Sequence, residues 1–197
     1  MSLRGVRCGD PNVSRSPRRV PRVRTSVRCA LAAAVLVSAS AGATDAPGDV
    51  GDVFFVAKSE NKNRVLYGLH LDAHCSPSGP APMFAYWRML ERGPRVVEPL
   101  LEREAPAYGI ASQRVVERDA HGGRLRLSLR ALPERFIDVT WGERGGTCYA
   151  RARTTIQGTP ATLESVFVQL KWPFGISYLL LWGRDAEGHV LREKVSP

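Results

Sequence analysis

Apolar and polar positions alternate along most of the chain after residue 50, and this alternation predicts β-strands. The clearest case is residues 124–130, where leucine alternates with arginine or serine without interruption. Such a strand has one buried face and one solvated face. Residues 53–57 instead form a continuous apolar run of strand length, which is typical of a strand covered on both faces.

Ten segments are predicted to be short strands. One follows Gln113, and the others span residues 53–57, 64–71, 83–90, 124–130, 135–141, 148–156, 162–170, 177–183 and 189–195. This pattern predicts an all-β fold, a single-domain antiparallel β-sandwich, with a β-barrel as the alternative. At most one short helix is expected, near residues 97–105, and its one or two turns stop near Pro106.

The N-terminal segment joins a basic stretch to a short apolar one. Residues 1–29 contain eight arginines and one aspartate, residues 30–41 are apolar, and Ala41-Gly42-Ala43 follows. This order is typical of a signal peptide that ends in a small-x-small cleavage site. The apolar run is shorter than the roughly 20 residues that a transmembrane helix needs, so we expect cleavage rather than anchoring.

These features predict how the chain is divided. We expect a signal peptide at 1–43, a short linker at 44–51 and one β-rich domain at 52–197, without a stable transmembrane segment after cleavage. The expected location is exported, either periplasmic or secreted. After removal of the leader 154 residues remain, which is enough for one domain that buries most of its surface.

The net charge loses its significance once the leader is set apart. The whole chain carries +9, and residues 1–43 contribute +7 of that, so the remainder carries only about +2. The basic surplus therefore does not indicate nucleic-acid binding by the mature domain.

Cysteine usage agrees with an exported domain. Of the four cysteines, two remain after cleavage, Cys75 and Cys148. An even pair in an oxidising compartment predicts a disulfide. Closing a loop of this size stabilises the folded state by roughly 4 kcal/mol in the chain-entropy model.

The strongest candidates for a metal site are His70, Asp72 and His74. At the period of a strand they share one face, and imidazole with carboxylate suits zinc or copper. This spacing raises one alternative function, a metal-dependent or carboxylate hydrolase that uses these three residues. An ordinary exposed strand edge would show the same pattern.

A second cluster combines a polar segment with an aromatic one. The first is Ser59-Glu60-Asn61-Lys62-Asn63, and the second is Tyr86-Trp87-Arg88, with Glu91 close behind. Amides, aromatic rings and an arginine could line a ligand pocket, although the same residues also make ordinary turns and cores. If the strand that carries Arg88 is internal, its charge needs a partner such as Glu60 or Glu91. The candidate ligand-binding residues are Glu60, Asn61, Asn63, Tyr86, Trp87 and Arg88.

The same two segments carry a resemblance to a known family. The chain resembles a family of small exported bacterial proteins that are defined only as a domain of unknown function. The likeness covers about residues 53–195, nearly all of the predicted mature domain. It implies the boundaries of the domain and brings no activity with it.

Arginines mark a third region. Arg124, Arg126 and Arg130 share one strand face, and Arg151 and Arg153 share another, beside Tyr149. If the two faces adjoin, an anionic envelope ligand could bind there. A solvated face that discourages edge-to-edge pairing is the alternative.

The sequence leaves the function open. Common enzyme motifs such as Gly-x-Ser-x-Gly, His-Glu-x-x-His and Cys-x-x-Cys are absent from it. We expect a soluble binding or structural module of the bacterial envelope that needs no cofactor, with the hydrolase as one alternative. A scaffold in an envelope assembly is another, and the aromatic segment 172–174 would be its contact surface.

Overall fold

The structure is a computed structural model that describes residues 50–119, 121–171 and 175–197. The predicted signal peptide, nearly all of the predicted linker and the aromatic segment 172–174 lie outside the described residues. From residue 50 onward the described chain belongs to one compact unit.

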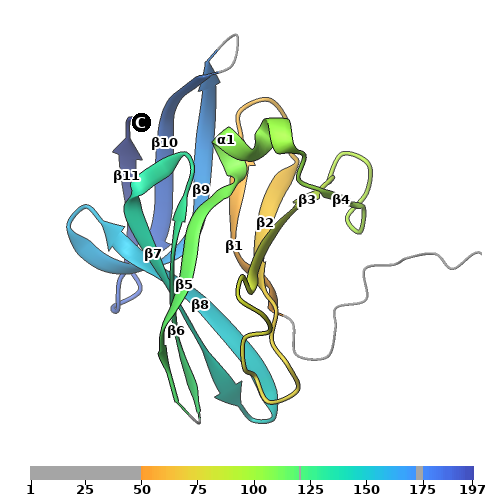
Figure 1. Cartoon of the computed structure of the whole chain (residues 1–197). Helices are drawn as coiled ribbons and strands as arrows, with labels where there is room; N and C mark the ends of the chain where they lie inside the picture. Colours follow the sequence, from red (N-terminus) through yellow and green to blue (C-terminus); the bar gives the residue numbers. More distant parts are fainter. Residues whose placement is uncertain (1–49, 120, 172–174) are drawn as a thin grey trace, which may run out of the picture. The chain divides into compact units, whose positions relative to one another are not determined.

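Eleven strands and two short helical segments make up this part of the chain (Figure 1). In chain order they are β1 (Val50–Lys58), β2 (Arg64–Leu69), β3 (Met83–Arg88), β4 (Val97–Pro99), the 3-10 helix η1 (Glu102–Glu104), α1 (Ala105–Tyr108), β5 (Ile110–Arg118), β6 (Gly122–Leu129), β7 (Leu132–Arg144), β8 (Thr147–Ile156), β9 (Thr159–Lys171), β10 (Gly175–Arg184) and β11 (Val190–Val195). The prediction of an all-β fold with one short helix is confirmed.

Hydrogen bonds connect all eleven strands into one sheet. The order is β4-β3-β2-β1-β9-β8-β7-β6-β5, and β10 pairs with both β9 and β11. The pair β1–β9 is parallel and the others are antiparallel, so the sheet is mixed. Period-2 alternation shows that a segment is a strand but not which strand it pairs with, so the parallel pair could not be predicted.

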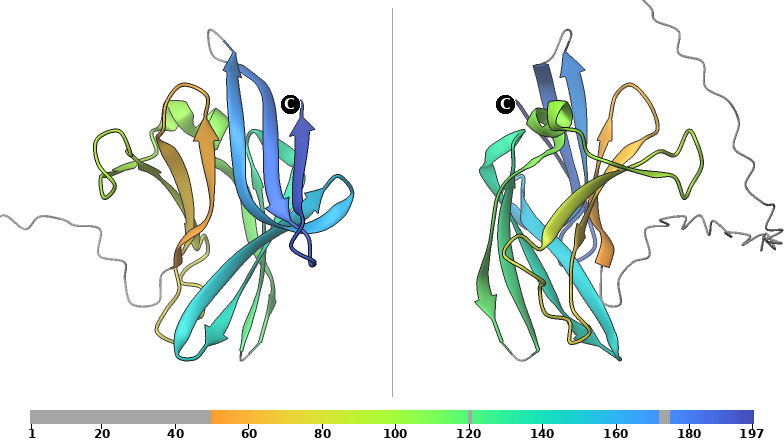
Figure 2. Two further views of the ribbon diagram at one scale, coloured as in Figure 1. Left: turned by 180° about the vertical axis from the view of Figure 1, so that it is seen from behind. Right: turned by 45° about the vertical axis from the view of Figure 1, so that its right-hand side comes forward.

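The sheet folds over on itself and encloses the core. Figure 2 shows β5–β7 on one side and β1–β3 on the other. Leu125, Leu127 and Leu129 of β6 are buried, as the alternation predicts, and they belong to the same core cluster as Val65 and Leu69 of β2. Ser128, which was expected on the solvated face, is buried as well, and its hydroxyl lies 2.8 Å from that of Ser112. Arg124 and Arg126 point away from this core.

The helical segment lies slightly later than predicted. Residues 97–99 form strand β4, and the helical turns begin at Glu102 and end at Tyr108. Pro106 does not stop the helix but occupies the first turn of α1, where its missing N–H would have no helical acceptor. The helix was expected, and the position of its boundary was wrong.

Aromatic contacts hold α1 against the sheet. Tyr67 stacks on Phe54 with ring centroids 4.4 Å apart, and its hydroxyl donates to the carbonyl oxygen of Tyr108. The ring of Tyr108 meets Trp87 edge-on, with centroids 5.1 Å apart. Burial raises the pKa of both Tyr67 and Tyr108 well above the usual range, so both hydroxyls stay protonated.

The predicted disulfide is present. Cys75 and Cys148 are bonded, with their Cα atoms 5.3 Å apart. The bond joins the loop after β2 to the start of β8, so it links two parts of the sheet that are 73 residues apart in sequence.

Candidate ligand-binding pocket

Strand β3 divides the predicted binding residues between its two faces. Val65 is the cross-strand neighbour of Trp87 and Leu66 that of Tyr86, so Trp87 faces the core side and Tyr86 the outer side. Arg88 lies on the same side as Tyr86 because side chains alternate along a strand. Tyr86 and Arg88 are therefore separated from Trp87.

The partner of Arg88 differs from the one expected. Its Nη1 atom lies 3.2 Å from Oδ2 of Asp52, at the start of β1, rather than beside Glu60 or Glu91. The hydroxyl of Tyr86 lies 3.3 Å from the carbonyl oxygen of Gly51. Nε of Arg88 is buried and has no hydrogen-bond acceptor among the described residues. Arg88, which lies on the outer face of the sheet, thus helps to hold the start of β1 in place.

Asn61 and Asn63 give the loop between β1 and β2 its shape. The backbone N–H of Asn63 donates to Oδ1 of Asn61 at 3.0 Å. The side chain of Asn63 is buried, and its Oδ1 accepts from the N–H of Glu91 at 3.2 Å. These bonds tie the loop to the segment just after β3, so the polar segment holds the backbone in place as well as presenting side chains.

Glu104 connects Trp87 to the helical segment. Its Oε2 atom accepts from Nε1 of Trp87 at 2.8 Å and from the backbone N–H of Leu101 at 3.0 Å. Nζ of Lys58 lies 5.3 Å from the centroid of the Trp87 ring and 3.5 Å from Oε2 of Glu60. Trp87 thus lies between an ammonium group and a carboxylate.

A pocket with a volume of about 320 Å³ opens at this place. Its walls come from the end of β1, the following loop, β3, β4 and η1, which Figure 1 shows close together beside α1. Its lining residues are Lys58, Asn61, Asn63, Trp87, Met89, Glu98, Pro99, Leu101, Arg103 and Glu104.

Only part of this pocket could be found from the sequence. Asn61, Asn63 and Trp87 were among the predicted binding residues, and Glu60 lies beside the pocket through its contact with Lys58. The charged residues of β4 and η1 were missed, because that stretch was interpreted only as a helical turn. The acids and bases clustered around residues 98–104 were the available signal.

The structure does not gather His70, Asp72 and His74 around a common point. Strand β2 ends at Leu69, so the strand alternation assumed for these residues does not continue. Oδ1 of Asp72 accepts the backbone N–H groups of His74 and Ser76, each at 2.9 Å, and the ring of His70 stacks on Phe84. A zinc or copper site here, and the hydrolase that would use it, stay predictions without geometric support.

The bond from Ser76, together with that from His74, lowers the pKa of Asp72 even though partial desolvation opposes the shift. Asp72 therefore acts as the acceptor that shapes a tight turn just before the disulfide.

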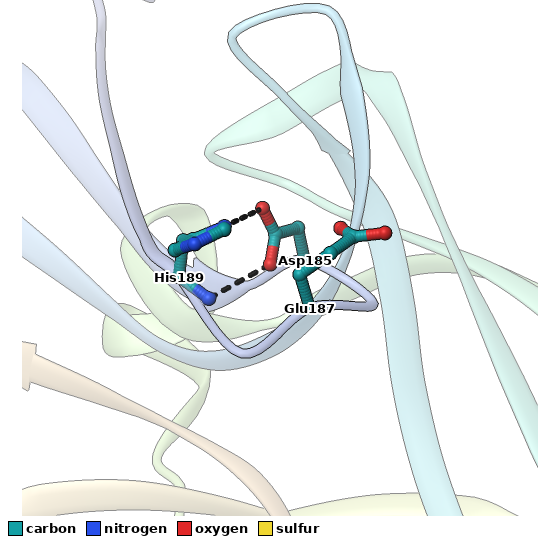
Figure 3. Close-up of side chains that lie close together, drawn as sticks. All are labelled: Asp185, Glu187 and His189. Atoms are coloured by element: carbon teal, nitrogen blue, oxygen red, sulfur yellow. Dashed lines mark hydrogen bonds and ion pairs between the residues drawn. The ribbon is translucent and has the colours of Figure 1, made fainter.

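The described residues contain one group of three potential metal ligands within 4.8 Å of one another, Asp185, Glu187 and His189 (Figure 3). Oδ1 of Asp185 accepts the N–H of His189 at 2.8 Å, and Oδ2 lies 3.0 Å from Nδ1 of the same residue. These contacts close the turn between β10 and β11. Asp119 has the same role between β5 and β6, where its Oδ1 accepts the N–H of His121 at 2.7 Å. The shared Asp therefore has a turn-forming role in both places.

No described helix has the length and apolar character to cross a membrane.

Fold and pocket together define an all-β domain with a small, mixed-charge pocket at the edge where β3, β4 and η1 meet. A family model described as "Domain of unknown function (DUF4833)" matches residues 54–194, and the chain belongs to this family. The match confirms the part of the resemblance that concerned a domain of unknown function. No curated protein matches the chain, and no solved structure matches it either.

Proposed function

We propose that this chain is an exported protein of the bacterial envelope whose β-domain binds a small zwitterionic ligand, such as an amino acid or a short peptide, in the pocket beside Trp87. One observation carries the proposal: the pocket of about 320 Å³ combines two cations, two carboxylates and two amides with apolar walls. This volume lies at the lower end of the range for small-molecule sites.

The balance of charge selects the ligand class. Lys58 and Arg103 provide two positive charges, and Glu98 and Glu104 provide two negative ones. A purely anionic or purely cationic ligand would meet as much repulsion as attraction there. A ligand with both an ammonium and a carboxylate group can pair with both signs, and the apolar wall of Met89 and Leu101 fits a side chain.

The carboxylates of the pocket are held in place by the protein. Glu104 accepts two hydrogen bonds through Oε2, and Glu98 is paired with Arg92. The other oxygen of Glu104, Oε1, makes no hydrogen bond or ion pair with any described residue. We therefore assign Glu104 to the recognition of a cationic group.

Export is the second part of the proposal. The Cys75–Cys148 bond supports it, because structural disulfides persist in oxidising compartments outside the cytoplasm. The signal-peptide pattern of the first 43 residues supports it independently.

A thermal-shift screen of amino acids and dipeptides against the purified, oxidised protein tests the binding function. The test variant is the double substitution Lys58→Gln and Arg103→Gln, which removes both cations of the pocket. The matched control is Lys62→Gln with Arg95→Gln, which removes the same charge from exposed residues outside the lining.

We expect at least one compound to raise the unfolding midpoint of the wild-type protein and of the control variant. The same compound should raise the midpoint of the test variant much less. A bound ligand at 100 times its Kd stabilises by about 2.7 kcal/mol, which is a shift of several degrees. A panel without any such compound, or equal shifts in both double variants, would contradict the proposal.

A further inference from the structure

Arginines gather on the outer face of strands β5–β8, on the side opposite to the core. Cross-strand neighbours share a face of the sheet, and one row runs from Arg126 through Asp138 to Arg153. The next row runs from Arg124 through Thr140 to Arg151. The two arginine-bearing faces that the sequence indicated therefore adjoin, with β7 between them.

One further arginine extends this surface. Arg114 of β5 is the direct neighbour of Arg126. We call the surface formed by Arg114, Arg124, Arg126, Arg151 and Arg153 the arginine face.

The net charge of the arginine face is more positive than the net charge of the whole domain. Its five arginines are accompanied by two acids, Asp138 and Glu117, the latter 3.5 Å from Arg124, so the face carries about +3. Residues 44–197 together carry only about +2. The positive charge is thus concentrated on this face rather than spread over the surface.

Protection of a sheet edge does not explain the arrangement. Charged residues discourage edge-to-edge pairing when they lie on edge strands. Strand β5 ends the sheet order, so this role fits Arg114, but β6 and β8 each have a partner strand on both sides. The arginines of β6 and β8 need a different reason.

The pairing of charges leaves three exposed arginines of this face, Arg114, Arg151 and Arg153, without a side-chain partner among the described residues. Asp138 accepts from Nε and Nη2 of Arg126 at 2.8 and 3.1 Å, and Nη1 of Arg124 lies 3.5 Å away. Arg151 and Arg153 are exposed and make no side-chain hydrogen bond or ion pair with any described residue. Asp138 thus orients one part of the face and leaves the guanidinium groups of β8 free for a ligand.

The face is hollowed and contains an exposed ring. A depression of about 380 Å³ is lined by Arg126, Arg135, Asp138 and Arg153 together with Phe136. Phe136 is 54 % exposed, and the guanidinium of Arg126 lies 5.5 Å from its centroid. An apolar ring in a basic hollow suits a ligand that has apolar surface as well as negative charge.

The spacing of the arginines indicates a chain with repeated charges. Residues two apart on a strand are separated by about 6.8 Å, and strands two apart by about 9.5 Å. A single carboxylate pairs with one guanidinium fork and cannot bridge such distances. Several acidic groups along one polymer can.

We propose that the arginine face binds an acidic polysaccharide, whose carboxylates pair with Arg151 and Arg153 while one sugar ring lies against Phe136. A polymer chain can enter the hollow, whereas the flat surface of a bilayer would contact only its rim. Sugar rings have apolar C–H faces that pack against an aromatic ring. A polyanion without such rings could not make this contact with Phe136.

Polygalacturonate, a polymer with one carboxylate per sugar, is the probe, and binding is measured by biolayer interferometry at low ionic strength. The test variant is Arg151→Gln with Arg153→Gln, which leaves the Asp138 pairs intact. Lys62→Gln with Arg95→Gln is again the control of equal charge. All variants keep the same N-terminal segment, so its eight arginines contribute equally to each.

We expect the test variant to bind polygalacturonate about tenfold more weakly than the wild-type protein, and the control to stay within about twofold. Phe136→Ala should weaken binding about threefold without any change in charge. Neutral dextran should not bind to any of the proteins.

Three results would overturn the proposal. The first is no binding of polygalacturonate by the wild-type protein, and the second is an equal loss in the test and control variants, which would mean attraction by net charge alone. The third is tighter, equally arginine-dependent binding to vesicles of anionic phospholipid, which would make a membrane the occupant.

Discussion

Removing the disulfide is expected to destabilise the domain by up to about 4 kcal/mol. The bond between Cys75 and Cys148 closes a loop with a sequence separation of 73 residues. In the chain-entropy model a loop of this length restricts the unfolded state by about 4.4 kcal/mol at 25 °C. Residual structure in the unfolded chain lowers the measured value, so we expect a loss of about 3 to 4 kcal/mol for Cys75→Ala with Cys148→Ala.

The backbone at Cys75 allows a second variant to be designed. Cys75 has a φ of 56°, in the left-handed region that only glycine adopts without strain. Cys75→Gly with Cys148→Ala should therefore be about 1 kcal/mol more stable than the double alanine variant. The comparison separates backbone strain from the effect of the crosslink.

Urea unfolding followed by tryptophan fluorescence measures these differences. The variants should show a lower free energy of unfolding and a larger m-value, because an unfolded chain without the crosslink exposes more surface. Wild-type protein reduced before unfolding should match the alanine variant. A loss below about 1 kcal/mol with an unchanged m-value would refute the argument, since the bond would then restrict little of the unfolded chain.

Three further predictions concern Glu104 of the pocket, the hydrogen bond from Tyr67 to the helical segment, and Asp138 on the arginine face. Glu104→Ala leaves the buried indole N–H of Trp87 without an acceptor and should destabilise the domain by about 2 kcal/mol in urea unfolding, whereas Glu104→Gln keeps an acceptor and should lose about half of that. Tyr67→Phe removes the donor to the carbonyl of Tyr108 and should cost about 1 to 2 kcal/mol, and an unchanged midpoint would show that water replaces it. The hydrogen bond from arginine lowers the pKa of Asp138, so this residue stabilises the fold above pH values near its ordinary pKa of 3.8, and that contribution is lost as the pH falls through the depressed value. The urea midpoint of Asp138→Asn should therefore change less between pH 5 and about pH 2.5 than that of the wild-type protein.

The strands could be predicted because their period is a local property. In β6 every second residue from Leu125 to Leu129 is a leucine of the core, so the pattern alone assigned the buried face of that strand correctly, although Ser128 on the opposite face is buried too. The disulfide could be predicted for a similar reason, because only two cysteines remain after the expected cleavage.

The pairing between strands could not be predicted from the sequence. The parallel pairing of Phe55 with Ser165 brings together residues more than a hundred positions apart, and no local pattern records it. The helical segment was displaced because proline ends a helix in its interior but is accommodated in its first turn, and Pro106 occupies the first turn.

The arrangement of the candidate site residues could likewise be predicted only in part. Asp72 was expected to continue a strand, but a short side chain next to a loop can instead accept backbone N–H groups and close a turn. Tyr86, Trp87 and Arg88 were grouped because they are adjacent in sequence. Adjacent residues of a strand point to opposite faces, so this grouping could not hold once the segment was predicted to be a strand.

Because side chains alternate between the two faces of a sheet, the two proposed sites lie on opposite faces and are independent of each other. The zwitterion pocket depends on Trp87 and on loops beside the inner side of β3, whereas the arginine face lies on the outer side of β5–β8. The two share no lining residue, and substitutions without common partners usually act additively. An effect of Arg151 and Arg153 on peptide binding, or of Lys58 on polysaccharide binding, would therefore require the sheet itself to transmit it. Because each site is built on a different face of the sheet from different residues, we expect each to bind its ligand whether or not the other is occupied.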